Sequence, residues 1–258
     1  MTDTLAGYWK RYKALSPWFV MACYVATLVV WGVLFLSPQS DRLLIAAVVI
    51  PLGVIADHLL HRSHAGRPNF ESSLITSGIV ALLLPPGISL LQAAAAVLLA
   101  VGSKHIIRFK GKHLFNPAAF GVAVTAIVFG YALGWWPDSY VWIAVALGLL
   151  NVWRVKKFPQ VLSFAAVYIV LLLVLSSLPL GSFSFDGLGQ QTLPLALPWF
   201  FMLFMLPEPV TSRQPRDEQL VFGALAAAVG VAATYVGVLA DAAMLWGLLA
   251  ANAFARLR

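Results

Sequence analysis

Four carboxylates stand at the edges of long apolar runs, and these residue types at these positions could do chemistry. Glu71 precedes one run, Glu208 interrupts another between two prolines, Asp57 ends a third and Asp241 starts a fourth. An acid at the edge of a bilayer is costly, so it usually faces a cavity, an ion or a partner. For Glu208 the alternative is a loop-capping role, and for Glu71 it is a favourable position near a helix N-terminus. We interpret Asp57 and Asp241 as interfacial.

Histidines gather just after Asp57. His58 and His61 are spaced to share one helical face, where they could bind a metal, and His64 follows. The alternative, a cytoplasmic loop beside lipid phosphates, is favoured, and we predict no metal site. None of the five histidines lies within an apolar run, which argues against haem. The single cysteine excludes a disulfide within the chain and an iron–sulfur cluster built from this chain alone.

An aromatic pair and a basic segment are further candidates. Phe200 and Phe204 lie one helical turn apart and could form a hydrophobic gate, the alternative being ordinary packing or lipid contact. Residues 104–113 carry four bases and two histidines, which could bind the phosphate of a flavin nucleotide or, as the composition favours, anionic lipid headgroups. No Walker, Gly-x-Gly-x-x-Gly, His-Glu-x-x-His or nucleophile-elbow motif occurs, so these enzyme classes have no support.

Membrane helices must position these residues. Of the 258 residues, 61% are apolar and 10% charged, whereas about a quarter are charged in ordinary soluble domains. This excludes disorder and most soluble enzymes, and it predicts an all-α polytopic membrane protein. A crossing takes about 20 helical residues. The predicted helices span residues 18–36, 43–56, 72–84, 88–103, 117–133, 140–153, 161–178, 193–206, 220–239 and 241–254.

The basic residues indicate how these helices are oriented. Alternate assignment of the connections to two sides places 16 of the 17 Lys and Arg on one side and Arg42 alone on the other. This is the positive-inside pattern, so we expect a multi-pass protein of the plasma (inner) membrane with both termini in the cytoplasm. Topology therefore explains the net positive charge, and no nucleic-acid partner is predicted. Trp135, Trp136 and Trp142 are predicted to form an aromatic belt at the opposite interface.

Two of the predicted helices are interrupted in the same way. Residues 72–84 run into Pro85-Pro86, and residues 193–206 run into Pro207-Glu208-Pro209. These are the third and eighth helices, equivalent positions in two five-helix repeats, of which the second must be inverted. We predict a cytoplasmic segment at 1–17 and one transmembrane domain at 18–258, with repeats at about 18–133 and 140–258. Asn116-Pro117-Ala118 in the fifth helix has a weak echo in Asn252-Ala253 of the tenth.

Three blocks resemble the NqrB/RnfD family, which supplies the ten-helix membrane subunit of ion-translocating NADH:quinone and ferredoxin:NAD oxidoreductase complexes. They are residues 71–86, the sequence Phe115-Asn116-Pro117-Ala118, and residues 204–212. The resemblance implies two inverted five-helix repeats like those of urea transporters, with half-helices at the third and eighth positions. It implies that Glu71 takes part in cation uptake and that Phe200 and Phe204 narrow the ion path. Glu208 stands where the family has the aspartate of a Thr-Asp-Pro motif, and Pro207 replaces the threonine.

One departure from the family concerns its covalent cofactor. Family members carry Ser/Thr-Gly-Ala-Thr between the fifth and sixth helices and esterify FMN to the last threonine. Here that connection, residues 134–139, lacks the motif, and the nearest look-alike, Thr76-Ser77-Gly78-Ile79, lacks the acceptor. We therefore expect no covalent FMN. Members also bind flavin without a covalent bond, and such a site could survive here, with the candidate ligands Lys104, Lys112, Asn116 and Thr211.

These observations support two functions. The first is a membrane subunit of an electron-transport system that binds FMN or riboflavin non-covalently and couples electron transfer to cation movement. Its partners would be membrane lipid and a cytoplasmic flavin or iron–sulfur reductase or other membrane subunits. The second is a channel or transporter for a small solute or cation, without redox chemistry, on the same fold.

Overall fold

The computed structural model describes residues 11–61, 70–177, 197–211, 215–237 and 242–257. Each of the ten predicted segments has a helical counterpart among these residues. Residues 178, 193–196, 238–239 and 241 of those segments, and with them the candidate acid Asp241, lie outside the described residues. The α-helices are α2 (Pro17–Phe35), α3 (Gln39–His61), α4 (Phe70–Leu83), α5 (Leu90–Ile106), α6 (Pro117–Phe129), α7 (Val141–Val155), α8 (Phe158–Ser177), α10 (Arg216–Tyr235) and α11 (Ala243–Leu257). A 3-10 turn, η1 (Trp136–Tyr140), precedes α7, and the eighth segment is the short π-helix η3 (Phe201–Met205).

Four of the described helices are long and apolar enough to cross a membrane. They are α2, α3, α8 over Phe158–Leu175, and α10. Three shorter apolar helices, α4, α5 and α6, accompany them. The predicted all-helical membrane class is therefore supported by the length and composition of these elements.

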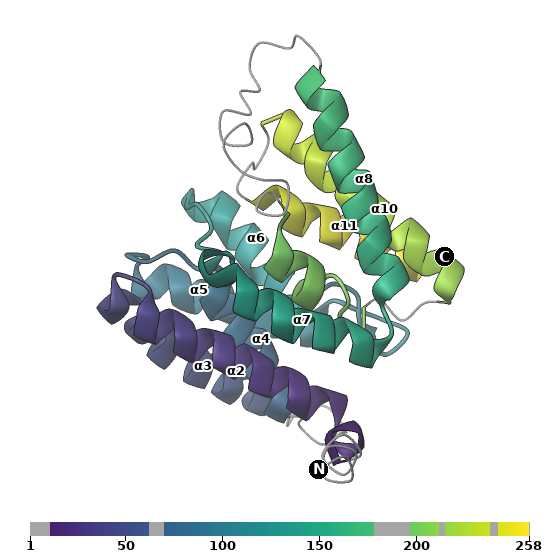
Figure 1. The fold of residues 1–258 in the computed structure, drawn as a ribbon. Helices are drawn as coiled ribbons and strands as arrows, with labels where there is room; N and C mark the ends of the chain where they lie inside the picture. The colour runs from purple at the N-terminus through teal and green to yellow at the C-terminus, as the bar shows by residue number, and fades with distance from the viewer. Residues whose placement is uncertain (1–10, 62–69, 178–196, 212–214, 238–241, 258) are drawn as a thin grey trace, which may run out of the picture.

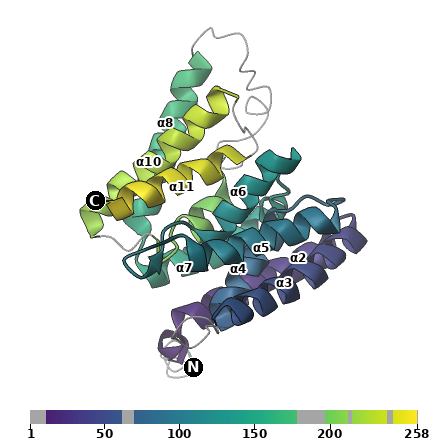
Figure 2. The ribbon, with the colours of Figure 1, turned by 180° about the vertical axis from the view of Figure 1, so that it is seen from behind.

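The helices form two groups, as the ribbon shows from opposite sides (Figures 1 and 2). Helices α2, α3, α4 and α5 pack together in the first group, and α8, α10 and α11 form the second. Between them lie α6, which packs on α5 and α11, and α7, which contacts α2 and η3. The central elements α4, α6, α7 and η3 therefore bring residues of both halves of the chain together.

Local sequence sets several helix ends. Ser16 accepts a hydrogen bond from the amide of Phe19 and so caps α2, whose first residue is Pro17. Asn116 caps α6 in the same way, again followed by proline. Helix α6 ends at Gly130, whose φ of 67° is the left-handed conformation that glycine adopts most readily.

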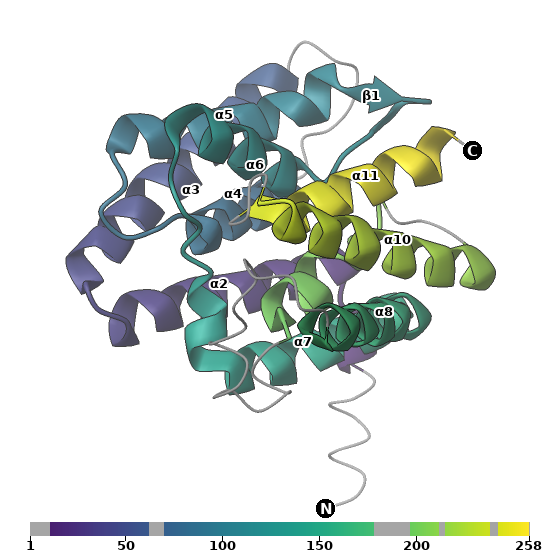
Figure 3. The ribbon, with the colours of Figure 1, turned by 90° about the horizontal axis from the view of Figure 1, so that it is seen from above.

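A β-hairpin follows α5 in the segment from which the sequence analysis predicted only a basic patch. Strands β1 (Arg108–Phe109) and β2 (Lys112–His113) pair antiparallel. The two residues of the turn, Lys110 and Gly111, both have positive φ, as a two-residue hairpin turn of type I′ requires. Figure 3 shows β1 extending beyond α5 at the end of the molecule where α11 also ends. The basic side chains are thus held on a defined turn.

Trp136 departs from the aromatic belt in which it was predicted. Its side chain is fully buried, and its indole N–H donates a 2.7 Å hydrogen bond to the carbonyl of Leu84, just past the end of α4. The guanidinium of Arg42 lies 4.9 Å from the centre of its ring. Trp142, by contrast, is 77% exposed, as a belt residue should be. Trp136 was misassigned because the end of α4 leaves backbone carbonyls that need a donor, and the indole N–H of Trp136 provides one for Leu84.

Candidate functional site: two adjoining cavities at the broken helices

A cavity of about 150 Å³ lies between the first half of α4 and the end of η3. Helices α2 and α7 and the start of α6 complete its wall. The apolar lining includes Met21, Ile75, Ile79, Val155 and Phe204, and the polar lining includes Thr76, Asn116, Asn151 and Glu208. A mostly apolar pocket with a few convergent polar groups is the usual form of a small-molecule site. We call it the central cavity.

The irregular backbone of η3 is satisfied by side-chain amides from three other segments. Asn151 of α7 donates to the carbonyl of Leu203 at 2.9 Å, and Asn116 donates to that of Met205 at 3.4 Å. Gln160 of α8 donates to the carbonyl of Leu206 at 2.7 Å. Within a membrane protein, carbonyls at the end of a helix are tolerated away from water only where other groups supply such partners. The amides therefore explain how the chain can stop a helix beside this cavity.

Asn116 and Asn252, the two asparagines noted in the fifth and tenth segments, are in direct contact. The backbone N–H of Asn116 donates to the side-chain oxygen of Asn252 at 2.8 Å, and both residues are buried. Asn116 also caps α6 with its own side-chain oxygen. It thus ties α6, α11 and η3 together at the wall of the central cavity.

Glu208 lines the central cavity and is held by the hairpin and by a residue of its own segment. Its Oε1 is 3.3 Å from His113 Nε2 on the hairpin, and its Oε2 accepts a 2.7 Å hydrogen bond from the Thr211 hydroxyl. The side chain is 17% exposed. The broken eighth segment thus delivers a partly buried carboxylate to a cavity, which is the arrangement expected for an ion or proton site.

The aromatic pair lies on the same short segment. Phe200 and Phe204 are both buried, with ring centroids 5.3 Å apart. Lipid contact is therefore ruled out for them. The amide of Phe200 donates to Asp138 at 3.2 Å, whereas Phe204 lines the central cavity. The pair thus extends from the cavity toward the end of the molecule that carries η1.

A second cavity, of about 240 Å³, adjoins the first and shares Trp18 and Ser72 with it. We call it the basic cavity because Lys104, Arg108 and Lys112 line it, together with three histidines. Lys104 is buried in the last turn of α5, and Lys112 is exposed on β2. This cavity has the charge that a phosphate or carboxylate ligand needs.

Asp57, which the sequence analysis interpreted as interfacial, is a buried centre of the basic cavity. Its carboxylate forms a 3.0 Å ion pair with Lys104, accepts a 2.5 Å hydrogen bond from Ser73 and lies 2.6 Å from His105 Nε2. The sequence feature that could have indicated this role is the position of the acid at the end of an apolar helix.

His61 completes a group with Asp57 and His105 whose ligand atoms lie within 4.8 Å of one another. The exposed His58 is not part of this group. Because the ammonium of Lys104 already binds the same carboxylate, we interpret the group as an ion-pair network that orders the basic cavity.

The remaining predicted residues lie close to these two cavities. Thr211 is buried against Glu208, and Lys104, Lys112 and Asn116 line one cavity or the other. Glu71 lies in the first turn of α4, next to Ser72, but is not among the residues that line either cavity. Its place in an ion path stays a prediction. Sequence reasoning included His113 only as a member of the basic segment, and it missed Asn151 and Gln160, although polar residues in or beside apolar helices were a usable signal.

The NQR2, RnfD, RnfE family matches residues 8–195, which is most of the chain and ends before η3 and Glu208. The chain belongs to this family. A search among curated proteins found no match. The apolar helices and the family together identify a membrane-embedded protein.

Proposed function

We propose that this chain is the flavin-binding membrane subunit of an Rnf- or Nqr-type electron-transport complex. The observation that carries the proposal is the pair of adjoining cavities, one apolar with amide groups and one basic. Family membership supplies the class of complex. The partners would be other membrane subunits and a cytoplasmic flavin or iron–sulfur reductase.

The residues around the cavities fit a flavin. An isoalloxazine ring has broad apolar faces and a polar edge, which match the apolar wall and the amides of the central cavity. The phosphate of FMN matches the basic cavity, which Arg108 and Lys112 of the hairpin line together with His113, the residue that also contacts Glu208. The combined volume falls in the range of small-molecule sites, roughly 300–1,000 Å³. When bound, the flavin would accept and donate electrons, while the protein sets its position and surroundings.

The protein's own part would be to orient the flavin and to exclude water. Asn116 is held by three hydrogen bonds, so its amide is a fixed group beside the ring. Ile75, Ile79 and Phe204 would cover the ring faces. Rigid support of this kind reduces the cost of ordering the site when the cofactor binds.

Cation movement would use the broken eighth segment. Glu208 would bind or release the cation or proton at the cavity mouth, and Phe200 and Phe204 would limit passage beyond it. Glu71 would contribute from α4.

The packing of the helices supports the inverted-repeat arrangement. In chain order, α2, α3, α4, α5 and α6 of the first repeat correspond to α7, α8, η3, α10 and α11 of the second. Corresponding pairs are in contact: α2 packs on α4 as α7 packs on η3, α3 on α5 as α8 on α10, and α5 on α6 as α10 on α11. Both termini would lie in the cytoplasm.

The test is flavin retention by mildly purified protein. We expect bound flavin by absorption, released on denaturation, with no fluorescent band on a denaturing gel. Lys112→Gln should weaken FMN binding about tenfold and riboflavin binding much less, because only FMN carries the phosphate. Lys110→Gln, an exposed lysine of the same turn that lines neither cavity, is the matched control.

Absence of any flavin from wild-type protein would overturn the redox proposal. It would favour the second candidate, a channel or transporter for a small solute or cation, which the missing FMN-acceptor motif already supports. A fluorescent band on the denaturing gel would show a covalent bond and refute the prediction of non-covalent binding.

A further inference from the structure

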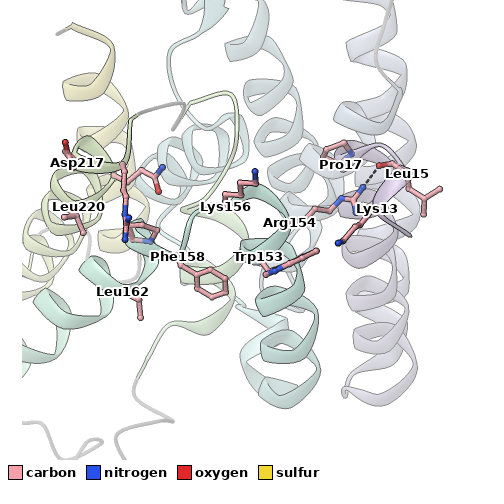
Figure 4. Close-up of a pocket in the computed structure, with 13 residues that line it drawn as sticks. Lys13, Leu15, Pro17, Trp153, Arg154, Lys156, Phe158, Leu162, Asp217 and Leu220 are labelled. Carbon is pink, nitrogen blue, oxygen red and sulfur yellow. Dashed lines mark hydrogen bonds between the residues drawn. The ribbon is translucent and has the colours of Figure 1, made fainter. Parts of the chain in front are cut away.

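A groove of about 1,020 Å³ opens where α2, α8 and α10 begin (Figure 4). The residues that line it come from the segment before α2, from the turn between α7 and α8, and from the first turns of α10. Of these residues, Pro17 alone also lines the central cavity. Neither the flavin site nor the ion path proposed above uses the rest of the groove.

The groove is strongly cationic on one side. Lys13, Arg154, Lys156 and Arg216 line it, against one acid, Asp217. Arg154 is held in place, because its guanidinium donates to the carbonyls of Tyr12 and Leu15. The side chains of Lys156 and Arg216 are exposed.

The helix ends around the groove add to this positive charge. Helices α2, α8 and α10 all start within its lining, at Pro17, Phe158 and Arg216. Each helix N-terminus carries a partial positive charge and unpaired amides. The backbone therefore favours an anion at the same place as the basic side chains.

The other side of the groove is apolar and exposed. Leu162 is 64% exposed, Leu220 48% and Phe158 37%. Figure 4 shows Trp153, Phe158 and Leu162 along one edge of the groove, with Lys156 pointing away from them. Exposed apolar side chains beside a cluster of cations match a ligand that has a charged head and an apolar tail.

We propose that this groove binds one anionic phospholipid of the surrounding leaflet, with its phosphate among Lys156, Arg216 and Arg154 and an acyl chain along Phe158, Leu162 and Leu220. A free phosphate would leave the apolar wall uncovered. A zwitterionic lipid would place a second cation among the basic side chains. A membrane-embedded chain meets such lipids continuously, so the site needs only a modest affinity to be filled.

The experiment is native mass spectrometry of the full-length protein, released from nanodiscs that contain equal amounts of phosphatidylglycerol and phosphatidylcholine. Wild-type protein should retain one phosphatidylglycerol in preference to phosphatidylcholine. Lys156→Gln/Arg216→Gln should weaken that retention roughly 30-fold, given the usual contribution of a basic residue near an anionic membrane. The control is Arg11→Gln/Lys110→Gln, which removes the same charge from two exposed bases that line neither the groove nor either cavity, and which should leave the retention unchanged.

Two additional measurements separate the sources of the signal. Leu162→Gln keeps every charge and should still weaken retention severalfold, which a phosphate-only site would not predict. Soluble glycerol phosphate at millimolar concentration should not displace the lipid. The proposal would be overturned by equal retention of the two lipids, by equal losses in the groove variant and its control, or by displacement with glycerol phosphate. Flavin content does not enter this test, so its failure is distinguishable from failure of the proposed redox function.

Discussion

Glu208 combines features that a simple loop-capping residue would not need. It belongs to the broken eighth segment, yet a histidine from the hairpin after α5 reaches its carboxylate. The hydroxyl of Thr211 binds its other oxygen. A carboxylate that lines a cavity and contacts a histidine 95 residues away in sequence agrees with our proposal that Glu208 takes up a cation or a proton.

Neutralising this acid should impair function without preventing membrane insertion. Glu208→Gln keeps the shape of the side chain and removes its charge, so we expect ion translocation or turnover to fall at least tenfold in reconstituted vesicles. Glu71→Gln should have a similar effect. If both acids serve one pathway, the double variant should be little worse than the poorer single variant.

Glu218→Gln provides the matched control, since Glu218 is an exposed acid in the first turn of α10. Its activity should equal that of wild type. Losses that multiply in the double variant would assign Glu71 and Glu208 to separate features. Wild-type activity in both single variants would remove the pathway from consideration.

Lys157 provides a test of electrostatics at the turn between α7 and α8. Burial lowers its pKa to about 8, from an ordinary value near 10.5. Between these two values the unfolded chain binds a proton that the folded chain has lost, so the stability of the wild type should rise with pH in this window. The full shift corresponds to about 3 kcal/mol.

Thermal unfolding of wild type and Lys157→Met in one detergent, from pH 6 to pH 10, checks this expectation. The stability of the wild type relative to the variant should be constant below pH 7 and should rise above pH 8, because the variant has no group to titrate there. A constant difference across the whole range would show that Lys157 keeps its ordinary pKa.

The residues of the site were only partly predictable. Glu208, Asn116 and Lys104 were found because acids, helix-capping asparagines and clustered bases are conspicuous in an apolar sequence. Asp57 was underestimated because its partners, Ser73, Lys104 and His105, come from two other helices. Which polar group meets which across helices depends on tertiary packing, and a single sequence does not contain that information.

At the scale of the elements, both interrupted helices end in the same physical way. The carbonyls of Leu83 and Leu84 accept hydrogen bonds from the amide of Gly134 and the indole of Trp136. The carbonyls at the end of η3 accept bonds from Asn116, Asn151 and Gln160. Each break therefore depends on donors from a distant segment.

Removing such a donor should destabilise the fold. Asn151→Leu leaves the carbonyl of Leu203 without this partner, and Trp136→Phe does the same to that of Leu84. An unsatisfied buried carbonyl costs about 1–3 kcal/mol. Both variants should melt at a lower temperature than wild type in the same detergent. Thr27→Val, which removes a local hydroxyl bond on the exposed side of α2, should change the melting temperature little. Unchanged melting of Asn151→Leu would show that its bond does not support η3.

The elements differed in how well the sequence predicted them. The helices followed from apolar runs, although α3 extends to Gln39–His61 where 43–56 was predicted, because its polar ends continue the helix beyond the apolar run. The hairpin at 108–113 was not predicted, because four strand residues around a turn show no hydrophobic alternation. The π-helical form of η3 was not predicted either, since the side-chain amides that bind its carbonyls come from distant segments.

At the scale of the whole molecule, contacts between distant segments agree with the assignment of the connections to two alternating sides of the membrane. Arg154 binds the backbone of the segment before α2, His113 contacts Glu208, and Arg256 donates to the carbonyl of Val210. All of these segments were assigned to the same side of the membrane from their charge. Arg42, the lone base of the other side, lies instead against Trp136.

The sidedness of these two ends can be tested by labelling with a membrane-impermeant thiol reagent. The native thiol, Cys23, is exposed and should first be replaced by serine. In that background, Ser139→Cys in η1 should react in intact cells. Gly187, a second outside position in the predicted topology, lies beyond the described residues.

A cysteine on the hairpin should react only after the membrane is opened. Gly111 is the central residue of that connection, but its φ of 79° makes any side chain there strained, so Lys110→Cys is the better reporter. Lys110 is exposed, which removes burial as a reason for failure to react. Labelling of Lys110→Cys in intact cells would reverse the orientation deduced from the 16 bases on one side. Labelling of both cysteines from outside would mean that α6 and η1 do not separate them by a membrane crossing. The assignment of successive connections to alternate sides of the membrane would then be wrong.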